Sequence, residues 1–298
     1  MSKQKPDDTE IFEAIVAAAI EAGKVVHDIY RGGFDVQRKA DASPVTDADN
    51  AAEAVILKRL REITPHIPVI AEEEVAAGRV PAIGNEFFLV DPLDGTKEFI
   101  QKRGDFTVNI ALIRDRTPVL GAVYAPARSS LFAGSVPNQT AFRSDENTDS
   151  SQTAPRRTIK VRSVPADGLI AVSSRSHSTP ETDAYLAQFN VSDRVSVGSS
   201  LKFCLVASGE ADLYPRLGRT MEWDTAAGHA VLVAAGGSVW APGGVPLLYG
   251  KPTFGNSYFI ASGTLIPPPL NPSAQLLNPI TSADPRTAQR IGLIALLR

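Results

Sequence analysis

The chain has little sulfur and no strong charge of either sign. One cysteine among 298 residues excludes an intrachain disulfide and is typical of a reducing compartment. A net charge of −3 does not favour nucleic acid or an acidic membrane surface as the main partner. We therefore expect a cytoplasmic protein that does not bind nucleic acid.

Long apolar segments are also missing. No apolar run reaches the length of a membrane span, and the polar first residues lead into no core of the signal-peptide kind. We expect no transmembrane segment, although peripheral association with a membrane stays open. With 43% hydrophobic and 21% charged residues, the composition is that of a globular protein with one large α/β domain or two packed ones.

The most informative stretch is FFLVDPLDGTKEF at residues 87–99. Its four leading apolar residues predict a strand buried on both faces, which should stop at Asp91 because Pro92 cannot donate to a sheet ladder. Gly95 lets the backbone approach a ligand, and Thr96 is placed to open a helix. Acids followed by free amides can hold a cation beside a phosphate, and the alternative is a turn in which the two aspartates only cap amides.

Other acidic residues occupy comparable positions. Thr46 is the expected N-cap of a helix over residues 47–63, with Asp49 three positions on as in a capping box, which by itself gives Asp49 a structural role. Glu72 begins a run of three acids, which is more often a solvated turn than a site, but the short apolar strand before it strengthens the case for a site. Asp224 opens a helix of small residues, and taken alone it is most simply an N-cap.

Breaks in the apolar pattern divide the chain into three parts. A stretch rich in Ser, Thr and Asp at residues 144–155 predicts an exposed loop at a boundary, and three prolines at 267–269 begin a segment unlike the core. We predict an N-terminal α+β subdomain over residues 1–155 with most of the metal ligands. A C-terminal α/β subdomain over 156–262 should set substrate specificity, followed by a proline-rich tail over 263–298, disordered or docked.

Four motifs in a fixed order connect these residues to a known family. They are SPVTDAD at 43–49, EE at 72–73, DPLDGT at 91–96 and WDTAAG at 223–228. With them the chain resembles the inositol monophosphatase superfamily of Mg²⁺-dependent, lithium-sensitive phosphatases, over roughly residues 9–262. Within it the chain is similar to the CysQ-type 3′(2′),5′-bisphosphate nucleotidases, which convert 3′-phosphoadenosine 5′-phosphate to AMP and phosphate and so clear a by-product of sulfate activation.

The segments that carry this second likeness are DGTKEFI at 94–100, SSRSH at 173–177, GSSLKFC at 198–204 and LYPR at 213–216. The resemblance implies a layered α/β (α+β) sandwich of alternating helix pairs and sheets, as in sugar phosphatases. It also implies two or three Mg²⁺ ions per site, with Mn²⁺ as a substitute and Li⁺ as an inhibitor, in a monomer or homodimer. The implied metal ligands are the side chains of Glu72, Asp91, Asp94 and Asp224 and the carbonyl oxygen of Leu93.

The residues themselves restrict the mechanism. Converging carboxylates need a counter-charge, and ligation by oxygen alone favours Mg²⁺ or Mn²⁺ over zinc. None of the four histidines lies in the acidic motifs, and Cys204 sits in an apolar run, so a phosphohistidine or phosphocysteine intermediate is not favoured. Direct attack by a metal-bound water is the simplest mechanism. By resemblance, Asp49 and Thr96 would hold and orient that water.

Substrate choice is expected to depend on the second half of the chain. Inositol phosphatases typically carry an acid at the position of Arg216, whereas a guanidinium there could bind a second phosphate. Lys202 adds positive charge, Ser199 adds a hydroxyl, and His177 could stack on an adenine. The alternative for Arg216 and Lys202 is an ordinary surface charge, and for His177 it is a loop histidine. The predicted substrate-binding set is Gly95, Thr96, His177, Ser199, Lys202, Arg216 and Asp224.

Two other functions stay open on the sequence. The first is the same chemistry on inositol 1-phosphate or another sugar phosphate, against which the positive charge of Arg216 argues. The second is a non-catalytic, metal-binding regulatory protein on the same fold. The presence of both Asp49 and Thr96 argues against that function, because a protein without catalysis has no physical need for a water-activating pair.

Overall fold

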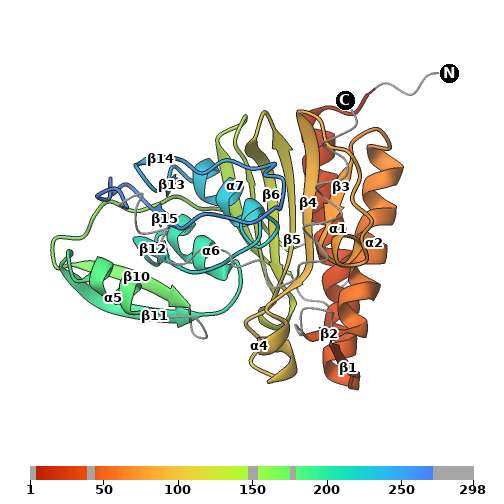
Figure 1. Ribbon diagram of the computed structural model, residues 1–298, viewed down its shortest axis with the longest axis horizontal. Coiled ribbons are helices and arrows are strands. Elements are labelled where there is room, and N and C mark those ends of the chain that lie inside the picture. The colour runs from red at the N-terminus through yellow and green to blue at the C-terminus, as the bar shows by residue number, and fades with distance from the viewer. Residues whose placement is uncertain (1–4, 39–43, 147–153, 175–178, 271–298) are drawn as a thin grey trace, which may run out of the picture.

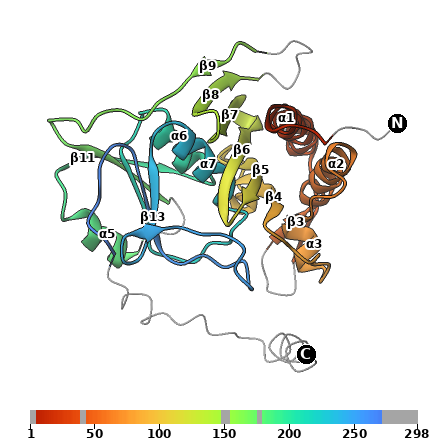
Figure 2. The same cartoon turned by 90° about the horizontal axis from the view of Figure 1, so that it is seen from above.

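The computed structural model describes residues 5–38, 44–146, 154–174 and 179–270. In this part of the chain, layers of helices alternate with two large sheets (Figures 1 and 2). Helices α1 and α2 cover one face of a seven-stranded sheet, and α6 and α7 lie between that sheet and a six-stranded one. Helix α5 packs on the outer face of the second sheet. The predicted layered sandwich is confirmed.

Local sequence explains the outer helix pair. The helices are α1 (Asp8–Gly32) and α2 (Asp47–Ile63). Helix α1 starts with a capping box, in which the Glu10 backbone N–H donates to Asp7 (2.8 Å), and it presents an alanine-rich stripe to the sheet. Helix α2 starts at the predicted N-cap, Thr46, with Asp49 at the third helical position. The short strands β1 (Val36–Arg38) and β2 (Pro44–Thr46) pair with each other before it.

The seven-stranded sheet runs in the order β3-β4-β5-β6-β7-β8-β9, with β3 parallel to β4 and the other neighbours antiparallel. Its strands are β3 (Val69–Ala71), β4 (Glu86–Asp94), β5 (Thr107–Arg114), β6 (Thr117–Ala125), β7 (Ser130–Ser135), β8 (Thr140–Asp145) and β9 (Arg157–Thr158). Three short helices join them: α3 (Glu72–Ala76), α4 (Thr96–Ile100) and the 3₁₀ helix η1 (Pro126–Arg128). The chain leaves β3 and β4 at the same end of the sheet, because these two strands are parallel.

The prediction that the central strand stops at Asp91 is wrong. Strand β4 continues to Asp94, with Asp91 opposite Asn109 of β5 and Asp94 opposite Thr107. Three steps along β4 therefore match two along β5, and one extra residue bulges out of the ladder. Pro92 is tolerated at this place because a bulge frees the strand from the regular hydrogen-bond pattern.

The six-stranded sheet runs in the order β11-β10-β12-β15-β13-β14. Strand β10 is parallel to β11 and β12, and the remaining neighbours are antiparallel. The strands are β10 (Leu169–Ser174), β11 (Val191–Val197), β12 (Leu213–Arg216), β13 (Ser238–Ala241), β14 (Val245–Pro246) and β15 (Phe259–Ser262), and the helices are α5 (Pro180–Leu186), α6 (Leu201–Ala207) and α7 (Ala226–Ala234). None of the helices in the described ranges has both the length and the apolar character that crossing a membrane requires.

The subdomain division stays a proposal, with a boundary near residue 155. Strand β9 (Arg157–Thr158) still pairs with the first sheet, and the second sheet begins with Leu169. Most of the predicted tail, residues 271–298, lies outside the described part of the chain. Its first residues pack beside α5, where the Tyr185 hydroxyl donates to the Pro268 carbonyl oxygen (2.8 Å).

Glycines in the first sheet allow α7 to approach it closely. An alanine Cβ at Gly121 of β6 would lie 2.4 Å from the Ala227 carbonyl oxygen, and one at Gly134 of β7 would lie 2.7 Å from the Val231 Cα. Both contacts involve helix backbone, which cannot rotate away as a side chain can. The position of α7, whose N-terminus follows Asp224, therefore depends on these two glycines.

We predict that Gly121→Ala lowers the free energy of unfolding by about 1–3 kcal/mol, because the added Cβ overpacks the interface with α7. Chemical denaturation measures the change. Gly32→Ala is the matched control, because a Cβ there meets nothing within 4 Å; it should alter stability by less than about 1 kcal/mol. Equal stabilities of the two variants would show that α7 can move away from β6 without cost.

Candidate active site

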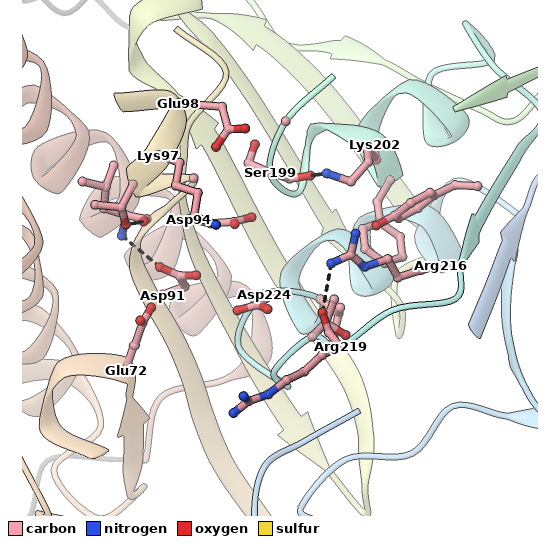
Figure 3. A pocket seen from close by; sticks show the side chains of 18 of the residues that line it. Glu72, Asp91, Asp94, Lys97, Glu98, Ser199, Lys202, Arg216, Arg219 and Asp224 are labelled. Carbon is pink, nitrogen blue, oxygen red and sulfur yellow. Dashed lines mark hydrogen bonds between the residues drawn. The ribbon is translucent and has the colours of Figure 1, made fainter. Parts of the chain in front are cut away.

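A cavity of about 300 Å³ opens where the ends of β3, β4 and β12 meet the starts of α6 and α7 (Figure 3). Predicted site residues from both halves of the chain line it: Glu72, Asp91, Leu93, Asp94, Gly95, Thr96, Ser199, Lys202, Arg216 and Asp224. Asp49 does not line the cavity and reaches it through Thr96. His177 lies outside the described residues, so its predicted contact with adenine stays a prediction.

One wall of the cavity is acidic. Burial raises the pKa values of the Asp91, Asp94 and Asp224 carboxyls, that of Asp94 to about 6. Repulsion from Glu72 and from one another raises them further, whereas the charge of Lys202 and a hydrogen bond from Asn109 act in the opposite direction on Asp94. The wall therefore concentrates negative charge where burial limits its solvation by water.

The chemistry of this wall fits a hard divalent cation. Its donors are carboxylate oxygens and the Leu93 carbonyl oxygen, the ligand type that Mg²⁺ and Mn²⁺ prefer. A bound cation would also remove the repulsion that raises the carboxyl pKa values. Within the described ranges, no three His, Cys, Asp or Glu side chains converge closely enough to hold an ion as they stand. Like charges repel, so a tighter arrangement requires the cation itself.

The bulge in β4 directs backbone groups into the cavity. The Leu93 backbone N–H donates to Asp91 Oδ1 (3.0 Å), which is the amide-capping contact of the alternative turn, formed here by Asp91. Gly95 has φ of 94°, in the left-handed region, and a Cβ there would lie 3.1 Å from the Asp105 carbonyl oxygen. Helix α4 begins immediately afterwards at Thr96. Glycine thus turns the chain so that the first amides of α4 lie beside the acids.

Asp49 forms the predicted cap and also faces Thr96. Its Oδ2 accepts from the Thr46 backbone N–H (2.7 Å) and the Thr46 hydroxyl (2.8 Å), which is the capping interaction. Its Oδ1 lies 3.5 Å from Thr96 Oγ1, which also lies 3.3 Å from the Leu93 carbonyl oxygen. The cap fixes one oxygen of the buried carboxylate and leaves the other facing Thr96.

The opposite wall is basic, and its charges are not on the surface. Arg216 is 9% exposed and Lys202 is 7% exposed. The Arg216 guanidinium donates to the Arg219 carbonyl oxygen (2.9 Å; Figure 3), but its buried Nε has no hydrogen-bond partner among the described residues. Lys202 Nζ donates to the Ser199 carbonyl oxygen, and burial lowers the Lys202 pKa to about 8. The interpretation of these two residues as ordinary surface charges is wrong.

Sequence reasoning missed three charged residues of the lining: Lys97, Glu98 and Arg219. Lys97 and Glu98 directly follow Thr96, so the motif itself could have identified them. Arg219 follows the end of β12 by three residues, and its backbone carbonyl holds Arg216. No periodic pattern marks Arg219, because the segment between β12 and α7 has no regular structure.

The sequence pattern of the Inositol monophosphatase family matches residues 7–267, which include both walls of the cavity. The 3′(2′),5′-bisphosphate nucleotidase CysQ of Salmonella typhimurium is 46% identical over 231 residues, which are 77% of this chain and 89% of that protein. The protein of the same name from Escherichia coli K12 is 45% identical over 80% of this chain and 94% of its own length. The crystal structure of CysQ from Bacteroides thetaiotaomicron is similar with a TM-score of 0.71 and 38% identity, over 85% of this chain and 97% of that one.

The raised carboxyl pKa values predict how stability depends on pH without metal. Well below the unfolded value of 3.8 these groups are neutral in both states, and the folded state becomes less favourable as pH rises from that value to the higher folded values. In chelator, the free energy of unfolding should therefore decrease as pH rises from about 4 to at least about 6, the folded value of Asp94. Denaturant titrations across this range measure it.

Asp91→Asn should reduce that decrease, because it removes the repelled charge, and the exposed Asp35→Asn should not. Adding Mg²⁺ at pH 8 should raise the free energy of unfolding more for the wild type than for Asp91→Asn. A wild-type protein whose stability in chelator rises over the same pH range would contradict the electrostatic description of the acidic wall.

Proposed function

We propose that this chain, which belongs to the inositol monophosphatase family, is a metal-dependent 3′(2′),5′-bisphosphate nucleotidase. It hydrolyses 3′-phosphoadenosine 5′-phosphate to AMP and phosphate, and so removes a by-product of sulfate activation. Membership of the family implies a metal-dependent phosphatase. The finer assignment draws on the nucleotidases named above and on a cavity with one acidic and one basic wall.

The observation that carries the choice of substrate is the unpartnered Nε of Arg216. A buried donor without an acceptor costs about 1–3 kcal/mol, so this atom favours a ligand that brings an acceptor. Lys202 lies in the same wall and adds a second cation. A substrate with two phosphates can place one among the acids, through the metal, and the other against this basic wall.

The metal ions, when bound, would neutralise the phosphate and the developing negative charge on the leaving oxygen, and would make water more acidic. We propose two or three Mg²⁺ per site, with Mn²⁺ able to substitute and Li⁺ inhibitory. Glu72, Asp91, Asp94, Asp224 and the Leu93 carbonyl would hold them. The backbone amides of Gly95 and Thr96 would bind the phosphate as hydrogen-bond donors.

The protein's own proton acceptor is the pair of Asp49 and Thr96. Because Oδ2 of Asp49 already accepts two hydrogen bonds from Thr46, Oδ1 is the oxygen that faces the Thr96 hydroxyl. With its hydrogen directed to Asp49, Thr96 Oγ1 can accept one from the attacking water and orient it. The water gives its proton to this pair as it attacks phosphorus in line with the 3′-oxygen of the ribose. The phosphorus–oxygen bond of the ester breaks, and the 3′-oxygen takes a proton from solvent as AMP leaves.

We further propose a small-molecule nucleotide as the partner and the cytoplasm as the location, on the charge and the single cysteine described above. Whether the chain works as a monomer or a homodimer does not alter this mechanism, since all the residues named belong to one chain.

The function is tested by phosphate release from 3′-phosphoadenosine 5′-phosphate, inositol 1-phosphate and fructose 1,6-bisphosphate, each with Mg²⁺ and with chelator. We expect rapid, Mg²⁺-dependent release from the nucleotide and at least about tenfold lower kcat/KM for the other two. Asp94→Asn should reduce turnover by about a hundredfold or more, because it removes a metal ligand. Preference for inositol 1-phosphate would refute the substrate assignment, and near-normal turnover of Asp94→Asn would refute the metal scheme.

Arg216→Glu should lower kcat/KM for the bisphosphate by on the order of a hundredfold, since it replaces a buried partner of the second phosphate by a like charge. The loss should be much smaller for a monophosphate such as inositol 1-phosphate. Arg194→Glu is the matched control, because this exposed arginine pairs with Asp183 outside the cavity. Equal losses on both substrates, or a loss in the control, would show that Arg216 acts through stability and not through recognition.

A further inference from the structure

Ser200 lies at the junction between the two halves of the acidic wall. It is 1% exposed and directly precedes α6. Its backbone N–H donates to the Asp94 carboxylate, which lowers the pKa of that carboxyl. Its hydroxyl donates to the Asp224 carbonyl oxygen (2.6 Å). One buried serine therefore contacts an acidic residue at the end of β4 and another before α7.

Asn109 of β5 completes this connection. Its side chain is buried, and its Nδ2 lies 3.3 Å from Asp94 Oδ2 and 3.1 Å from Ser200 Oγ. The amide has two hydrogens and so can donate to both. The Ser200 hydroxyl then accepts from Asn109 and gives its single hydrogen to Asp224. The donors in this chain of hydrogen bonds are assigned consistently, whereas the buried Asn109 Oδ1 has no hydrogen-bond partner among the described residues.

The turn that carries Ser200 is held against the first half of the molecule. The Gly198 backbone N–H donates to Asp105 Oδ2 (3.3 Å), and a Cβ at Gly198 would lie 2.6 Å from the Asp105 carbonyl oxygen. The Asp224 side chain is held in turn, because its Oδ2 accepts from the Met221 backbone N–H (2.8 Å). The bridge thus connects two parts that are each fixed locally.

We propose that Asn109 and Ser200 are positioning residues that set the separation of the Asp94 and Asp224 carboxylates and thereby determine the affinity for divalent cations. These carboxylates come from different layers of the fold, and repulsion from Asp94 adds to the effect of burial in raising the pKa of Asp224. The hydrogen bonds hold them near one another against that repulsion. The inference rests on the proposed function only in requiring that these acids bind a divalent cation.

The test is a calorimetric titration of the full chain with Mn²⁺ in the absence of substrate. Ser200→Ala and Asn109→Ala should each raise the Mn²⁺ dissociation constant by about tenfold or more, the usual cost of losing a group that orients a metal ligand. The Mn²⁺ dissociation constant of the double variant should be only slightly higher than the higher of the two single-variant values, because both residues act through one chain of hydrogen bonds. Ser200→Thr keeps the hydroxyl and should recover affinity relative to Ser200→Ala.

Ser262→Ala is the matched control. It removes an equally buried serine hydroxyl that has no hydrogen-bond partner among the described residues, and it should leave Mn²⁺ affinity within about twofold of wild type. Thermal unfolding in chelator shows whether each variant is folded. If Ser200→Ala does not fold, Asn109→Ala and Ser200→Thr decide the question.

Dissociation constants within about twofold of wild type for the folded bridge variants would overturn the proposal. Measuring phosphate release by the wild type distinguishes failure of this proposal from failure of the proposed function. Nucleotide hydrolysis with unaltered variant affinities would refute the bridge alone, whereas weakened Mn²⁺ binding without nucleotide hydrolysis would refute the substrate alone. A wild-type chain that binds no Mn²⁺ would refute both.

Discussion

Asp91, Asp94 and Asp224 lie with Glu72 where burial and mutual repulsion raise the aspartate pKa values, and this electrostatic strain constrains the structure around them. Carboxylates in such a place persist only if rigid elements hold them there, so they come from the ends of strands and the start of a helix. The bulged end of β4 carries the first two, and glycines in β6 and β7 let α7 bring the third close. Stability is given up here for a site that can receive a cation.

The basic wall, like the acidic wall, needs opposite charge to offset its own. Arg216 and Lys202 are buried, as Asp91 is, and the charge of Lys202 lowers the pKa of Asp94. Phosphate groups can connect the two walls, because their oxygens accept from the guanidinium on one side and contact metal on the other. The chemistry and the specificity proposed here therefore use a single pattern of charge, divided between the two sheets.

Much of the fold and of the acidic site could be predicted from local sequence. The strand before Asp91, the cap at Thr46 and the helix of small residues after Asp224 are all short-range patterns, and the structure has them. The end of β4 was predicted wrongly, because a proline breaks an ordinary ladder but is compatible with a bulge. Asp49 shows a different difficulty: a capping residue and a residue of the site have the same sequence pattern, and here one carboxylate forms the cap and also faces Thr96.

The sequence by itself determined which elements form, which acids end the buried strands and which family the chain resembles, since these depend on neighbouring residues and their order. Only the tertiary structure decided that Arg216 and Lys202 are buried, that Arg219 lines the cavity, and that Asn109 and Ser200 join two acids 130 positions apart in the chain. These properties arise from contacts between distant segments, and the residues next to a position in the chain do not determine which distant groups it will contact.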